Sequence, residues 1–167
     1  MNTQPTKGIS MRSIKRTLQA GVAAVEFAFV LVIMLLIMAG MVEFGRTFWY
    51  ADALTKATRD GARVMSSWPI DTISTQGLGA ARNITKDSAN AANVSPSLAN
   101  VNVVVECLNE GFGVVACNDG TAPANVRVSI NGFTVNLGEW FPFIGTDGLI
   151  SFGGIPLAPH TTMRYMN

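Results

Sequence analysis

The sequence has little charge and few of the residues that build catalytic sites. Only 14% of its 167 residues are Asp, Glu, Lys or Arg, whereas 49% are hydrophobic. An average soluble domain has about 25% charged residues. The net charge is +1, which argues against a protein that binds nucleic acid through Lys and Arg contacts to phosphates.

Motifs for catalysis are also missing. The sequence has no Gly-x-Ser-x-Gly motif, no phosphate-binding loop and no His and Cys residues at metal-ligand spacing. The single histidine is His160, and a lone histidine is more often structural than catalytic. We therefore expect a protein that is not an enzyme and that uses neither a cofactor nor a metal.

The chain does have one long apolar run. Residues 22–42 contain a single charge, Glu26, and they are long enough to cross a bilayer, which takes roughly 20 residues. A secretory signal peptide is the main alternative, but its apolar region is only about 7–15 residues long. Residues 1–21 contain no acidic residue and four basic ones, namely Lys7, Arg12, Lys15 and Arg16. By the positive-inside rule this leader stays in the cytoplasm and the rest of the chain crosses the membrane.

The apolar run belongs to a longer predicted helix. No proline lies between Pro5 and Pro69, so we expect a helix from about residue 15 to 66, preceded by disordered residues 1–13. Phe48, Trp49 and Tyr50 follow the apolar run and fit the outer membrane boundary, with packing on the exported domain as the alternative. Seven residues at spacings of three and four predict one buried stripe on the second half of the helix: Phe44, Phe48, Ala51, Thr55, Thr58, Ala62 and Met65.

The remainder predicts a small domain with an antiparallel sheet. A weaker helical pattern covers residues 72–91, and residues 101, 103, 105 and 107 alternate as one face of a strand. Asn131-Gly132 between two alternating segments, 126–130 and 133–137, predicts a β-hairpin in which Ile130 lies opposite Phe133. We expect a loop over 138–157 and a last strand over 161–165. The predicted fold class is α+β, with a long N-terminal transmembrane and stalk helix packed on this sheet.

Two cysteines, Cys107 and Cys117, lie in the part predicted to be exported. In an oxidising compartment two nearby thiols usually pair, so we expect a disulfide; two reduced, unrelated cysteines are the alternative. The loop-entropy estimate for so short a closed loop is about 2–3 kcal/mol of stabilisation.

Glu26 is the unusual residue of the apolar run. A charged side chain at the centre of a spanning helix costs about 2.5–3.5 kcal/mol on insertion scales, and less near the helix end. In one interpretation Glu26 stays protonated or reaches the cytoplasmic surface and has no role. In the other, cleavage after Gly21 creates an α-amino group on Val22, and Glu26 of a neighbouring subunit pairs with it. That pair would fix the axial register between subunits.

The residues around Glu26 favour the second interpretation. Gly21, four apolar residues, Glu26 and Phe27 follow a basic leader and precede a long apolar run, which resembles the signal read by prepilin peptidases. Three segments together resemble the TadE-like family of minor pseudopilins, from the tight-adherence (Tad/Flp) type IV pilus systems of bacteria: Ala23-Ala24-Val25-Glu26-Phe27, Glu43-Phe44-Gly45-Arg46 and Arg59-Asp60-Gly61-Ala62-Arg63.

The resemblance implies a pilin-like fold and a set of roles. A prepilin peptidase would cut between Gly21 and Val22, and Glu26 and Phe27 would serve subunit assembly. Major pilins of this system typically have Tyr at the position of Phe27, which favours a minor subunit. The motif Glu43-Phe44-Gly45-Arg46 has no settled role, although the spacing of Glu43 and Arg46 allows an intrahelical ion pair of about 0.2–0.5 kcal/mol.

The resemblance also implies where the protein acts. It would contribute to pilus biogenesis and surface adherence as a single-pass protein of the bacterial inner membrane, with a cytoplasmic N-terminus and a periplasmic domain that is extracellular within a pilus. Its partners would be the prepilin peptidase, other pilus or pseudopilin subunits, the inner-membrane assembly platform and the lipid bilayer, and not nucleic acid. The alternative is a membrane-anchored adhesion or binding module outside any filament. The predicted organisation is a leader (1–21), a transmembrane helix (22–42), its amphipathic continuation (43–67) and an exported domain (68–167).

Overall fold

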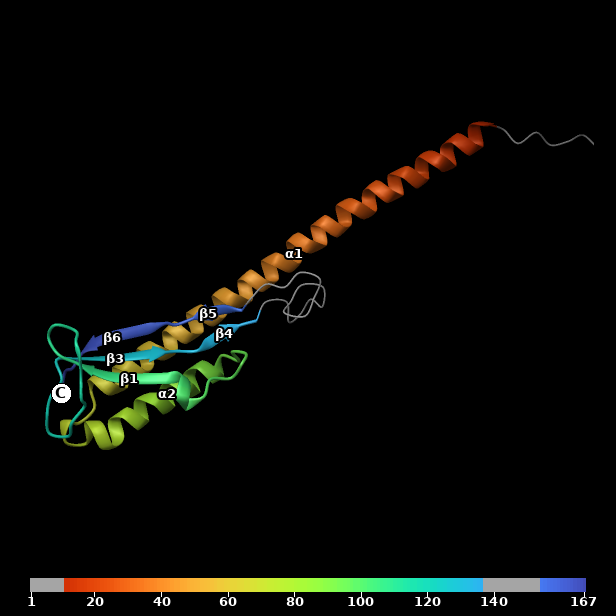
Figure 1. The fold of residues 1–167 in the computed structure, drawn as a ribbon. Helices are drawn as coiled ribbons and strands as arrows, with labels where there is room; N and C mark the ends of the chain where they lie inside the picture. The colour runs from red at the N-terminus through yellow and green to blue at the C-terminus, as the bar shows by residue number, and fades with distance from the viewer. Residues whose placement is uncertain (1–10, 137–153) are drawn as a thin grey trace, which may run out of the picture. The chain divides into compact units, whose positions relative to one another are not determined.

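The computed structural model describes residues 11–136 and 154–167, with side chains from residue 21 onward (Figure 1). The disorder expected for residues 1–10 and most of the loop expected over 138–157 lie outside the described residues. The chain divides into two compact units, Met1–Val42 and Glu43–Asn167.

The first element is a single helix, α1, which extends from Met11 to Ser66. The long helix expected from the absence of proline is confirmed, and it also includes residues 11–13, which were expected to be disordered. The helix ends just before Trp68-Pro69 because the residue before a proline is restricted to extended conformations. Between residues 21 and 42, every side chain except Ala39 is exposed.

A second helical segment follows, as predicted. It begins with a 3₁₀ turn, Ile70–Thr72, and a π-helical turn, Ile73–Gly77, and continues as α2, Leu78–Ala91. A methyl group on Gly77 would lie 2.8 Å from the indole ring of Trp68, so glycine lets the π-helical turn pack against Trp68, just beyond the end of α1. A short 3₁₀ helix, Asn100–Asn102, leads into the sheet.

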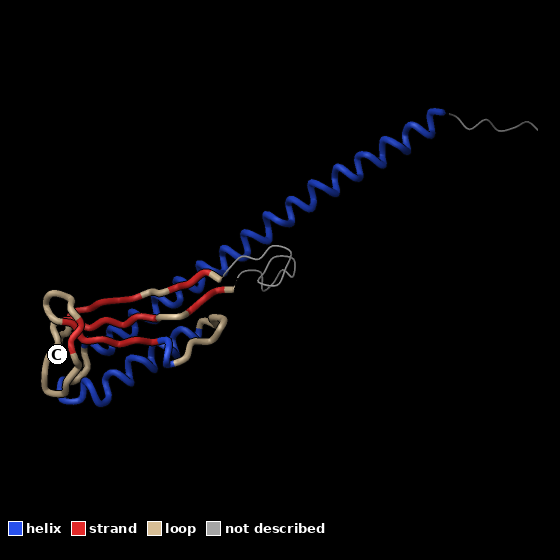
Figure 2. The backbone as a smooth tube through the Cα atoms, in the orientation of Figure 1, coloured by secondary structure: helices blue, strands red, loops and turns tan. Residues whose placement is uncertain are grey.

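The main sheet is antiparallel and has the strand order β2-β1-β3-β6. Its longer strands are drawn in red and lie side by side in Figure 2. Its strands are β1 (Val103–Leu108), β2 (Val114–Val115), β3 (Asn125–Ile130) and β6 (His160–Arg164). Alternate residues of β1 and β3 are buried, so one face of the sheet packs on the helices. The predicted α+β fold class and the last strand are confirmed. The face expected for β1 is correct except at Val101, which lies in the preceding 3₁₀ helix and is exposed.

The predicted hairpin at Asn131-Gly132 is wrong. β3 pairs with β1 along one edge and with β6 along the other, whereas β4 (Phe133–Val135) pairs with β5 (Ile155–Leu157) in a separate two-stranded sheet. The predicted loop over 138–157 is also wrong at its end, because residues 155–157 form β5. The apolar residues of β3 and β4 do share the buried core, as predicted: Val126, Val128, Ile130, Phe133 and Val135.

Hydrogen bonds from Ile130 and Asn131 to two different neighbouring segments explain why the chain does not turn back at the Asn-Gly pair. The Ile130 N–H donates to Pro159 O, and the Asn131 N–H donates to Asn102 O. A type I′ turn needs positive φ at both central residues, but here positive φ occurs only at Gly132 (71°). The strand pairs 129↔160 and 133↔157 lie on either side of this break. β3 and β4 therefore run on in one direction beside β6 and β5 (Figure 1).

The core of the second unit joins both helices to the sheet. On α1 the buried residues include Tyr50, Leu54, Ala57, Thr58, Ala62 and Met65. The predicted stripe is correct from Thr58 onward and wrong at Phe44 and Phe48, which are 65% and 61% exposed. A repeat of 3.5 residues drifts by about 20° per heptad on a helix of 3.6 residues per turn. Over the three heptads from Met65 back to Phe44, the drift rotates the predicted stripe away from the core.

Candidate functional site

The predicted cleavage junction lies on an open stretch of α1. A methyl group added to Gly21 would meet no atom within 4 Å, and Val22 is 61% exposed. Among the described side chains, none therefore lies close to Gly21.

The two predicted assembly residues follow on the next helical turn. Glu26 and Phe27 are both exposed, and Glu26 lies four residues after Val22, on the same face of the helix. A carboxylate at this position is surrounded on the helix surface by exposed apolar side chains, among them Val25, Phe29 and Val30. Such a surface suits a membrane or other helices better than water.

The second motif forms a compact charged cluster. The Arg46 Nη2 donates to the Glu43 Oε2 at 2.8 Å, and each side chain is only 11% exposed. The hydroxyl of Thr47 donates to the Glu43 carbonyl at 3.0 Å. The structure thus contains the intrahelical ion pair that the spacing allowed, but in a largely buried setting.

Arg46 also reaches the sheet domain. Its Nη2 donates to the backbone carbonyl of Asn136 at 2.6 Å, and its guanidinium carbon lies 5.8 Å from the centre of the Tyr50 ring. Tyr50 in turn makes an edge-to-face contact with Phe133, with ring centres 6.4 Å apart. The motif therefore fastens α1 to the end of β4.

Two members of this cluster, Tyr50 and Asn136, were not predicted from the sequence. The spacing of four residues between Arg46 and Tyr50 was a usable signal, because such pairs share a helix face. Asn136 acts through its backbone carbonyl, and the residue type gives no sign of that contact.

Phe44 and Gly45, the middle residues of the motif, lie on a different face of α1. Phe44 stacks on Phe48, with ring centres 4.7 Å apart and both rings exposed. A methyl group on Gly45 would meet no atom within 4 Å. Charged residues of the motif thus turn toward the domain, whereas its apolar residues turn away from it.

The third segment, residues 59–63, forms the crossing of the two helices. A methyl group on Gly61 would overlap the Thr85 hydroxyl of α2 and approach the Ala81 carbonyl at 3.1 Å. Gly61 and Ala62 are buried, whereas Arg59, Asp60 and Arg63 are exposed. The small residues therefore set the separation of α1 and α2.

The predicted disulfide is confirmed. Cys107 of β1 is bonded to Cys117, ten positions later. The enclosed turn is also held by Asn109, whose Oδ1 accepts the Gly113 N–H at 2.8 Å.

Together these features describe a protein with an apolar N-terminal helix that can serve as a membrane anchor and a small α+β domain. Among the described residues, α1 from Gly21 is the one helix long and apolar enough to cross a membrane. Residues 21–63 match the family model described as TadE-like protein. The match confirms the resemblance and places this segment in the TadE-like family of the Tad pilus system.

The matched segment starts at the proposed cleavage junction and ends at the helix crossing, so it lies entirely within α1. It includes all three segments that carried the resemblance. No curated protein and no solved structure matches the chain.

Proposed function

We propose that this protein is a minor pseudopilin of a Tad-type pilus, cut between Gly21 and Val22 by a prepilin peptidase. The observation that carries the proposal is the start of the TadE-like match at Gly21, where the basic leader meets the apolar part of α1. The exposure of this junction supports access by a protease.

In this proposal the leader lies in the cytoplasm and the sheet domain in the periplasm of a bacterial cell. The basic residues of the leader support that orientation, and the disulfide supports an oxidising compartment for the domain. The protein acts as a structural subunit rather than an enzyme. Its partners are the peptidase, other pilus subunits and the assembly platform of the inner membrane.

Glu26 has the assembly role. Its carboxylate lies on an apolar helix surface, where an unpaired charge is costly. The new amino group on Val22 of a neighbouring subunit offers it a partner and fixes the axial position of one helix against the next. A purely apolar contact would specify that position poorly.

Intact mass and N-terminal sequencing of the protein, from cells with and without the peptidase, test the cleavage. We expect a mature chain that begins at Val22 only when the peptidase is present. Gly21→Leu should block maturation, whereas the control Gly40→Leu, at another open helix position, should be processed normally. A chain that stays at full length in both strains would reject the pseudopilin assignment in favour of an anchored adhesion or binding module.

Glu26→Ala tests the assembly role separately. We expect normal cleavage and membrane insertion but a loss of pilus assembly, scored by electron microscopy and by recovery of sheared pili. Val30→Ala, one helical turn further on, shortens an exposed apolar side chain without removing a charge and should assemble pili. Normal piliation with Glu26→Ala would show that the carboxylate has no assembly role.

A further inference from the structure

The exposed face of α1 changes character abruptly between Trp49 and Asp52. From residue 43 to 50, the exposed positions are Phe44, Gly45, Phe48 and Trp49. From residue 51 to 66, the exposed positions are all charged: Asp52, Lys56, Arg59, Asp60 and Arg63. A helix that left the membrane at residue 42 would have no need of aromatic rings on the face that points away from its own domain.

The charges within the aromatic stretch are turned inward. Glu43 and Arg46 neutralise each other at 2.8 Å on the side of α1 that faces the domain, and Arg46 also binds the Asn136 carbonyl. Residues 43–50 therefore present no charged side chain on their exposed face. This arrangement would be unnecessary for a segment surrounded by water, where exposed charges are tolerated at little cost.

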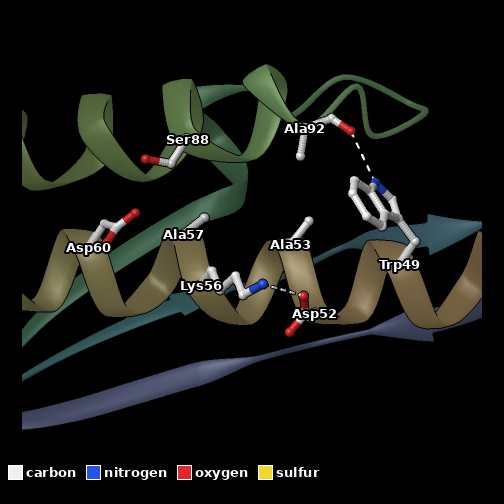
Figure 3. Close-up of a pocket in the computed structure, with 8 residues that line it drawn as sticks. All are labelled: Trp49, Asp52, Ala53, Lys56, Ala57, Asp60, Ser88 and Ala92. Carbon is white, nitrogen blue, oxygen red and sulfur yellow. Dashed lines mark hydrogen bonds and ion pairs between the residues drawn. The ribbon is translucent and has the colours of Figure 1, made fainter.

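Trp49 marks the end of the apolar surface. Its indole N–H donates to the Ala92 carbonyl at 3.3 Å, although the side chain is 61% exposed (Figure 3). Trp49 also lines one end of an open groove of about 210 Å³ between α1 and α2, whose other lining residues are alanines together with Asp52, Lys56, Asp60 and Ser88 (Figure 3). An aromatic ring with one polar edge, placed between an apolar and a charged surface, is typical of a membrane–water interface.

We propose that the outer interface of the lipid bilayer extends to Trp49, so that the exposed side chains of Phe44, Phe48 and Trp49 lie among lipid headgroups. The proposal rests on the proposed membrane anchoring of α1 and deepens it by naming lipid as the occupant of the exposed face of residues 44–49. The apolar segment 22–42 fills the hydrocarbon core, and seven further residues add about 10 Å of helix, slightly more than one headgroup layer of roughly 5–8 Å, so that Trp49 reaches the outer edge of that layer. The exposed surface of residues 43–50 carries no charge and ends at the indole of Trp49, which favours lipid over a separate protein partner because Trp gathers at the membrane–water interface.

Depth-dependent quenching tests the proposal on the full-length protein in nanodiscs of phosphatidylcholine and phosphatidylglycerol. A fluorescent label is attached to single engineered cysteines, Phe48→Cys or Arg59→Cys, after the native disulfide has formed. Nitroxide groups on the lipids act as quenchers. We expect severalfold greater quenching at position 48 than at position 59, and greatest quenching at position 48 with nitroxides near the headgroup.

A third labelled variant, Ile33→Cys within the apolar segment, tests the membrane anchor separately from the interfacial position of residues 44–49. Strong quenching at position 33 together with quenching at position 48 equal to that at position 59 would overturn the interfacial proposal and leave the membrane anchor intact. If the same quenching result were accompanied by cross-linking from position 48 to another subunit, the exposed face of residues 44–49 would contact a protein partner instead of lipid. Absence of quenching at position 33 would overturn the anchor itself.

Discussion

Gly61 of α1 faces Thr85 of α2 so closely that a methyl group on the glycine would overlap the threonine hydroxyl. Thr85 is held in place because its hydroxyl donates to the Ala81 carbonyl at 2.7 Å, within a fully buried contact. The helix crossing therefore depends on the absence of a side chain at position 61.

We expect Gly61→Ala to destabilise the domain by about 1–3 kcal/mol, the usual range for overpacking a core. Gly79→Ala on α2 is the matched control, because a methyl group there meets no atom within 4 Å. Replacing an exposed helical glycine by alanine should stabilise the domain by about 0.5–1 kcal/mol. Thermal unfolding of the full-length protein in detergent, followed by circular dichroism, measures both. Equal stability of the two variants would show that α2 moves aside at no cost.

Arg46→Ala should destabilise the domain by about 2 kcal/mol or more. The substitution leaves the largely buried carboxylate of Glu43 without this ion-pair partner and removes a hydrogen bond to Asn136, and breaking one side of a buried pair costs about 3–5 kcal/mol.

Lys56→Ala provides the control for Arg46→Ala. Lys56 pairs with Asp52 at 2.7 Å, but those side chains are 68% and 60% exposed, and exposed pairs contribute at most about 1 kcal/mol. Chemical denaturation of the full-length protein would compare the two losses. If Arg46→Ala lost no more stability than Lys56→Ala, the motif would not serve as a fastening between α1 and β4.

Reduction of the disulfide should destabilise the domain by about 2–3 kcal/mol, because the ten-residue separation of the cysteines closes only a short loop. The double variant Cys107→Ser and Cys117→Ser should lose a similar amount, and the reductant should have no further effect on it. A variant that is still destabilised by reductant would show that the reductant acts elsewhere.

Tyr165 should make the domain less stable at alkaline pH. Burial raises the pKa of its hydroxyl above the ordinary value of about 10, and the negative charge of Asp71 raises that pKa further. Below pH 10 the tyrosine is neutral in both folded and unfolded chains, so its contribution is fully present. As the pH rises above 10, the unfolded chain ionises first, and the stability falls until the folded tyrosine also loses its proton.

Tyr165→Phe is the test of this pH dependence. The variant loses the hydrogen bond from the tyrosine hydroxyl to the Trp68 carbonyl at 2.7 Å, which costs about 1 kcal/mol at neutral pH. Its stability should then fall less steeply than that of the native protein above pH 10, when both are measured by chemical denaturation. An unchanged alkaline decline would assign the effect to other groups.

The long helix and the alternation of β1 were predictable from local sequence because each depends on residues close together in the chain. The strands that pair with β3 could not be predicted in this way, because an Asn-Gly pair permits a turn but does not require one. Two distant backbone carbonyls, those of Asn102 and Pro159, accept hydrogen bonds that hold the chain extended there. No local pattern could show that these groups would be in reach.

The site could be predicted only in part for a similar reason. The ion pair of Glu43 and Arg46 follows from a spacing of three within one helix. Its burial does not, because it depends on Asn136, 90 positions further along the chain. Gly61 belongs to a motif that the sequence shows. The need for glycine at this position follows only from the packing of α2 against it.

The last strand gives the order in which this domain can be completed during synthesis. The Thr161 hydroxyl bonds to Thr58 of α1 at 2.9 Å, and the Met166 N–H donates to the Ser66 carbonyl at the end of that helix. The two threonines are 103 positions apart, so this contact forms only after β6 has been synthesised. A chain released before residue 160 would leave one edge of β3 unpaired, and an open strand edge is a template for pairing with other chains.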